Sequence, residues 1–181
     1  MRLVPLLAAG LLLTACGGGS EQSAEKPTPT RVAPSEPATG RVTTADGSAS
    51  LELPDGYALY GEQDLDGVVV LAATRARATD EQVFVGRFDD RGAAEDAAVY
   101  AATTVAGQGG RCARDTGDTT YGAPRLVVDC AFGDPEQFHK VFVVLGNQRR
   151  GALLTVQTAA TSRAGTRDVV APILASWRWK A

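Results

Sequence analysis

The second half of the chain repeats one pattern, in which a short apolar and β-branched segment is followed by a polar or glycine-rich break. Such runs are typical of β-strands, because a strand needs only a few apolar residues to bury one face. The pattern predicts strands at 111–116, 125–132, 138–145 and 152–158. Residues 146–151 contain two glycines and an asparagine, which favours a hairpin loop between the last two strands. This repetition limits the fold to one built on antiparallel strand pairs.

Two other segments have helical periodicity. Residues 93–105 are rich in alanine and follow Asp89 and Asp90, whose side chains can cap a helix N-terminus. Residues 167–177 carry an apolar stripe, with Pro172 either in the first turn or at a kink. We therefore expect two helices, one of them C-terminal.

Further strands are expected at 50–53, 68–74 and 82–88. Together the elements predict an α+β fold, an antiparallel sheet of about six or seven strands packed against two helices. Because hairpins join most of the strands, we expect both helices on one face of the sheet.

The N-terminus has a different character. One basic residue, Arg2, precedes an apolar run from Leu3 to Leu13, and Thr14 and Ala15 then lead to Cys16 and three glycines. This combination resembles the lipobox of bacterial lipoproteins. The resemblance implies a signal peptide at 1–15, a diacylglyceryl group on Cys16, and a lipid-anchored domain on the extracytoplasmic side of the cell membrane. The run is shorter than the roughly 20 residues that span a bilayer.

Three cysteines are present, and an odd number in an exported chain leaves one without a partner. Lipidation of Cys16 would account for it and leave Cys112 and Cys130 as a structural disulfide. One alternative is an ordinary signal peptide with Cys16 in a disulfide. Another is a redox or metal-binding pair, which the missing Cys-x-x-Cys spacing and the single histidine disfavour.

Residues 16–48 hold four of the nine prolines and few sizeable apolar side chains. Such a composition cannot offset the chain entropy of folding, so we expect a lipidated cysteine followed by a disordered tether with a reach of about 30 Å. The globular domain is then expected at 49–181. The net charge of −3 argues against nucleic acid and leaves the acyl anchor as the expected contact with the membrane.

Several short signatures occur in a defined order. They are Leu53-Pro54-Asp55-Gly56-Tyr57, then Gly122-Ala123-Pro124 before a strand, and a closing helix that ends in Ile173-Leu174-Ala175-Ser176-Trp177. In this order they resemble the PsbP-like and LpqN-like α/β families. The resemblance implies a central antiparallel sheet between helices, in proteins that act as adaptors, assembly factors or ligand-binding modules. No catalytic motif is shared, so the resemblance assigns no functional residue.

Alternate carboxylates at Glu62, Asp64 and Asp66 precede a glycine, as in the first half of a calcium loop. The twelfth loop position, where calcium loops usually supply a bidentate carboxylate, is Ala73. We therefore expect an acidic turn and no metal site.

His139 stands in a strand pattern without a nucleophile motif beside it, and we expect an exposed or half-buried strand residue. Helical register turns Trp177 toward the core and leaves Trp179 nearer to solvent, as a possible contact for a ligand or partner. We expect no catalytic residue and no cofactor. Two function classes follow: a non-enzymatic envelope accessory or protein-interaction module, or a binder of a small apolar or lipidic ligand between sheet and helices.

Overall fold

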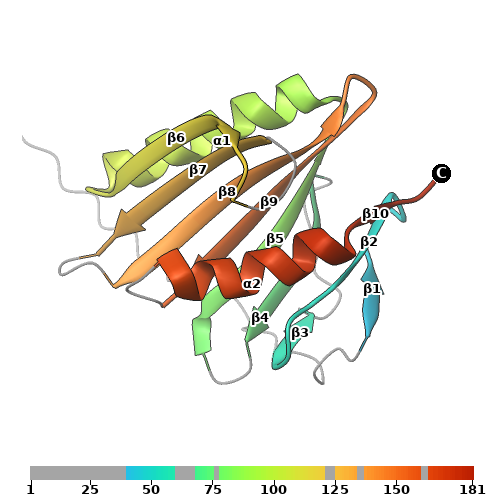
Figure 1. Ribbon diagram of the computed structural model, residues 1–181, viewed down its shortest axis with the longest axis horizontal. Helices are drawn as coiled ribbons and strands as arrows, with labels where there is room; N and C mark the ends of the chain where they lie inside the picture. Colours follow the sequence, from blue (N-terminus) through green and yellow to red (C-terminus); the bar gives the residue numbers. More distant parts are fainter. Residues whose placement is uncertain (1–39, 60–67, 76–77, 121–124, 134–136, 160–162) are drawn as a thin grey trace, which may run out of the picture. The chain divides into compact units, whose positions relative to one another are not determined.

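The computed structural model describes residues 40–59, 68–75, 78–120, 125–133, 137–159 and 163–181. Figure 1 shows their elements, which in chain order are β1 (Arg41–Thr43), β2 (Ala49–Glu52), β3 (Tyr57–Leu59), β4 (Val69–Arg75), β5 (Ala78–Phe88), α1 (Arg91–Gly107), β6 (Arg111–Asp118), β7 (Arg125–Phe132), β8 (Phe138–Asn147), β9 (Arg150–Thr158), α2 (Arg163–Ser176) and β10 (Arg178–Trp179).

Seven strands form the main sheet in the order β3-β4-β5-β9-β8-β7-β6, and every neighbouring pair is antiparallel. A smaller sheet has the order β1-β2-β10. The predicted α+β fold with an antiparallel sheet and two helices is confirmed.

The two helices lie on opposite faces of the main sheet, as Figure 1 shows. Val127 belongs to the buried cluster that contains Ile173 of α2, whereas its neighbour Val128 belongs to the cluster that contains Ala98 of α1. Successive strand residues point to opposite faces, so a continuous apolar run marks a strand buried on both sides. The expectation of both helices on one face is therefore wrong, and the sheet between helices that the family resemblance implied is present.

Asp90 is the N-cap of helix α1, and its carboxylate accepts a hydrogen bond from the backbone N–H of Ala93 at 2.8 Å. Ala94 and Ala98 are fully buried against the sheet. Small side chains on this face let the helix approach closely, and a Cβ at Gly151 of β9 would collide with the backbone carbonyl of Asp90. A glycine is thus required where the start of α1 crosses β9.

Helix α2 begins four residues before the predicted start, because Arg163–Thr166 contains no apolar periodicity to reveal it. Pro172 lies inside the helix rather than in its first turn. Val170 and Ile173 are fully buried. Neither helix, nor any other in the described part of the chain, is long and apolar enough to cross a bilayer.

Strand β3 was not predicted. Its Tyr57 is 1 % exposed, and burial first, with the nearby Glu81 carboxylate second, raises the pKa of this phenol to about 12. The positive charge of Arg75, which pairs with Glu81 at 3.0 Å, lowers the pKa of Tyr57 and so offsets part of this rise.

Strand β1 lies inside the segment that the sequence analysis assigned to the tether, so the expectation of disorder is wrong for residues 41–43. Its three residues pair with β2. The Arg41 guanidinium also donates to the Ser176 carbonyl at 2.8 Å and pairs with Glu52 at 3.2 Å. Long-range polar contacts of this kind have no signature in local composition.

Candidate functional site

A hollow of about 720 Å³ lies between β6, β7 and the start of α2. This α2 hollow forms because α2 packs along β2, β8 and β9 and leaves the same face of β6 open. Its volume is within the range of small-molecule and peptide side-chain sites. The charged residues of its walls are Arg114, Asp115, Asp118, Asp129, Arg167 and Asp168.

Four aspartates and two arginines line the α2 hollow, and one of the arginines, Arg114, also lines the hollow on the α1 side. Asp115 accepts a hydrogen bond from the N–H of Gly117 at 2.8 Å, and Asp118 accepts one from the N–H of Thr120 at 2.6 Å. These bonds hold the two carboxylates near the end of β6. Among the described residues no group of three or more His, Cys, Asp or Glu is arranged to hold a metal ion. The lining of the hollow is therefore acidic overall.

His139 lies behind the α2 hollow, in β8. It is 8 % exposed, which corrects the expectation of an exposed or half-buried residue. Its Nδ1 is 3.3 Å from Oδ1 of Asp129, and the pair is ionic only when the imidazole is protonated. Asp129 lines the hollow, whereas the imidazole does not. Among the described residues this buried Nδ1 has no partner in hydrogen-bonding geometry, so Asp129 is its close charged neighbour and not its hydrogen-bond acceptor.

A second buried polar pair lies beneath the same end of α2. The hydroxyls of Thr158 and Thr166 are 2.9 Å apart, and both residues are buried. Thr158 stands opposite His139 in the β8–β9 register. Because buried polar groups are expensive to leave without partners, this pair fixes the start of α2 on β9.

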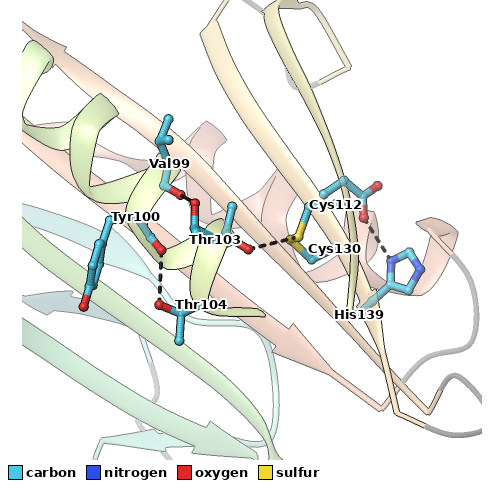
Figure 2. Close-up of a disulfide and its surroundings, with 9 residues drawn as sticks. Val99, Tyr100, Thr103, Thr104, Cys112, Cys130 and His139 are labelled. Carbon is cyan, nitrogen blue, oxygen red and sulfur yellow. Dashed lines mark hydrogen bonds and ion pairs between the residues drawn. A yellow bond between two sulfur atoms is a disulfide. The ribbon is translucent and has the colours of Figure 1, made fainter. Parts of the chain in front are cut away.

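The structure joins Cys112 of β6 and Cys130 of β7 in a disulfide, the pairing expected from the cysteine count (Figure 2). The two cysteines are direct register partners with Cα atoms 4.0 Å apart. Cys130 is fully buried under α1, and the Cys112 sulfur lies 3.6 Å from the Ala102 carbonyl oxygen. The bond therefore joins β6 covalently to its neighbouring strand, and its sulfur lies against the overlying helix.

Strand β6 is the outermost strand on its side of the sheet, and seven of its eight residues are exposed. On the α1 side it borders a second hollow of about 200 Å³, whose lining includes Val99, Thr103 and Val128. Figure 2 shows Thr103 of α1 on the side of the disulfide and Tyr100 farther from it, and Tyr100 is 77 % exposed. Recessed surface thus flanks β6 on both faces of the sheet.

Trp179 lies in β10 rather than in a helix, and it is half-buried. Its ring contacts that of Trp177 with centroids 5.2 Å apart, and the Arg150 guanidinium lies 4.9 Å from its centroid. Trp177 is 9 % exposed and belongs to the core, as its register predicted. The ring of Trp179 is therefore largely engaged by the protein itself, and its role in recognition stays a prediction.

The remaining predicted residues, Cys16, Glu62, Asp64 and Asp66, lie outside the described residues. Conversely, the sequence analysis missed the charged walls of the α2 hollow. Asp115 and Asp168 are distant along the chain, and the sheet order that brings β6 to the side of α2 is not visible in local composition.

No family model matches the sequence, and no curated protein is similar to it. Among solved structures, the chain is similar to the solution structure of the cyanobacterial PsbP protein CyanoP from Synechocystis sp. PCC 6803, with a TM-score of 0.54 and 15 % identity over 78 % of this chain and 92 % of that one. A crystal structure from Bacteroides thetaiotaomicron VPI-5482 matches with a TM-score of 0.47 and 6 % identity, over 78 % of this chain and 48 % of that one. The first likeness supports a PsbP-like fold.

Proposed function

We propose that this protein is a membrane-anchored lipoprotein of the extracytoplasmic side, and that its domain is a non-enzymatic accessory module that docks on another envelope protein. The lipobox-like sequence ending at Cys16 supports the anchor. The Cys112–Cys130 disulfide supports an oxidising compartment, since such bonds persist mainly in exported proteins.

The observation that carries the docking function is the buried apolar packing between the sheet and each helix. Leu154, Val156 and Ile173 are fully buried on the α2 side, and Ala94 and Ala98 on the α1 side. An apolar ligand seated between sheet and helices would have to displace such side chains, at several kcal/mol for each large one. The recessed α2 hollow is open and charged instead. Recognition of a polar surface or segment suits this molecule better than storage of a lipid.

A non-enzymatic role is supported by the position of His139. An imidazole serves as a general base only when it reaches the reacting group. Here Asp129 lines the hollow and the imidazole does not, and the hydroxyls of Thr158 and Thr166 bond to each other within the core.

The anchor is tested by expressing the wild-type and Cys16→Ser chains in the bacterium that carries the gene. The wild type should be acylated and sediment with membranes, and the variant should lose the acyl label and become soluble. A variant that stays in the membrane fraction would contradict the anchor.

The docking function is tested by native mass spectrometry of the acylated full chain extracted from those membranes. A polypeptide that co-purifies stoichiometrically with the wild type is the expected result. A retained lipid-sized mass with no accompanying polypeptide would instead establish the apolar-ligand alternative.

A further inference from the structure

We propose that the free edge of β6, together with the α2 hollow, is a strand-addition site for an extended segment of another protein that carries basic side chains. This inference rests on the proposed docking function and specifies the partner's chemistry.

The first step is the exposure of the edge. β6 pairs with β7 alone among the described strands, and it is eight residues long. The opposite edge strand, β3, has three residues, of which Tyr57 and Ala58 are buried. Proteins usually shorten or cover such edges, because unpaired backbone groups attract other strands. A long edge strand with no further strand beside it in the described part of the chain is therefore a candidate for β-augmentation.

The second step is that this edge is held in place. A strand with almost no buried side chain contributes little to the core and would fray readily. The disulfide from Cys112 to Cys130 attaches β6 to a strand whose Leu126 and Val128 are buried. A strand ordered before binding loses less conformational entropy when a partner pairs with it.

The strand register determines which backbone N–H and C=O groups of β6 are available to a partner. A Cα separation of 4.0 Å between Cys112 and Cys130 belongs to the narrow, non-hydrogen-bonded type of antiparallel pair. In such a pair the N–H and C=O groups point away from the partner strand. Cys112 therefore directs its backbone groups to the free edge, and Arg114, two positions later, does the same. A register irregularity between Asp115 and Asp118 ends the regular ladder.

The charged residues of the α2 hollow determine which side chains are favoured in the partner. Alternate side chains of a strand added beside β6 would project on the α2 side of the sheet, where Asp115, Asp118 and Asp168 line the hollow. Because these three aspartates face Arg167 as the arginine that α2 contributes to the lining, lysine or arginine at these positions is favoured over glutamate or aspartate.

The test uses the acylated full chain in non-ionic detergent and two synthetic ten-residue peptides. One alternates lysine with valine and threonine, and the other has glutamate in place of every lysine. The lysine peptide should bind about tenfold more tightly or better, and this preference should weaken with salt. At saturation, hydrogen exchange of the amides of Cys112 and Arg114 should slow relative to the free protein.

Two variants at one position separate the backbone from the side chain. Arg114→Pro removes an outward N–H without touching the bonds to β7, a change that edge strands tolerate. This variant should bind the peptide about tenfold more weakly, because one intermolecular hydrogen bond is lost and the proline ring stands in its place. Arg114→Ala keeps the N–H and should bind the lysine peptide as well as the wild type or better. Unfolding midpoints measured in urea confirm that both variants are folded.

A third variant, Asp115→Asn with Asp118→Asn, should reduce the preference for lysine over glutamate even if the proline variant does not fold. Equal binding of the two peptides, or equal behaviour of the Arg114→Pro and Arg114→Ala variants where both fold, would overturn the strand-addition site. If the site fails while an envelope polypeptide still co-purifies with the acylated chain, docking occurs elsewhere. If none co-purifies, the proposed function itself fails.

Discussion

Removing the cross-link between β6 and β7 should lower the free energy of unfolding by about 3 kcal/mol. The joined cysteines are 18 positions apart. Closing a loop of that length removes chain entropy from the unfolded state, worth roughly 3 kcal/mol at 25 °C. Cys130 is fully buried and Cys112 is exposed, so alanine at both positions adds only a small packing defect.

Urea unfolding of three samples measures this loss: the oxidised wild type, the same protein in reductant, and Cys112→Ala with Cys130→Ala. For a slope of about 2 kcal/mol/M, the midpoint should fall by about 1.5 M in both the reduced protein and the double variant. Agreement between these two separates loop closure from packing, because only the variant lacks the sulfur atoms.

A midpoint shift below about 0.5 M would refute the loop-closure argument, since it would mean that the bond constrains the unfolded chain far less than its length predicts. A large shift in the double variant alone would assign the stabilisation to packing of the Cys130 sulfur instead.

Gly151→Ala should destabilise the protein by more than about 2 kcal/mol, because its Cβ meets the backbone at the start of α1, whereas Gly107→Ala meets open space and should be neutral or slightly stabilising; thermal unfolding compares the two. Thr166→Val should cost about 1–3 kcal/mol by leaving Thr158 buried without its partner, and the double valine variant should recover part of this loss in urea unfolding, unless the hydroxyl pair is unimportant. Burial raises the pKa of Tyr57 to about 12, so the unfolded phenol ionises before the folded one and the free energy of unfolding should fall between about pH 10 and 12. Tyr57→Phe should flatten that decline, and an unchanged slope would contradict it.

The sequence predicted the central part of the sheet because its strands have strong local signals. The runs 125–132 and 152–158 are dense in β-branched and aliphatic residues, and the structure has β7 and β9 at Arg125–Phe132 and Arg150–Thr158. The prediction that Asp89 or Asp90 caps the first helix is confirmed at Asp90. A carboxylate directly before an alanine-rich segment can accept a hydrogen bond from a backbone N–H of the first helical turn.

Short elements escaped prediction because tertiary contacts define them. β10 has two residues, and it is a strand only because β2 lies beside it. The prediction that both helices cover one face of the sheet was also wrong, since Leu126, Val127 and Val128 are buried in succession. Such a succession indicates a strand buried on both faces, and hairpin connectivity does not determine which faces the helices cover.

The α2 hollow could not be predicted in the same way. Asp115 and Asp118 belong to an edge strand, and Arg167 and Asp168 to a helix that reaches them only through the fold. Each of these residues resembles an ordinary solvated side chain when taken alone. Charge at a sheet edge becomes informative only after the strand order is known.

The place of β1 has a mechanical consequence. Within the described residues, a pull on the chain from its N-terminal side meets the first long-range side-chain contacts at Arg41, the first residue of a strand three residues long. The Arg41 side chain forms an ion pair with Glu52 of the neighbouring strand and donates a hydrogen bond to the Ser176 carbonyl in the last turn of α2. Such a pull would therefore be transmitted through the Arg41 side chain to two elements that are distant in sequence, β2 and α2.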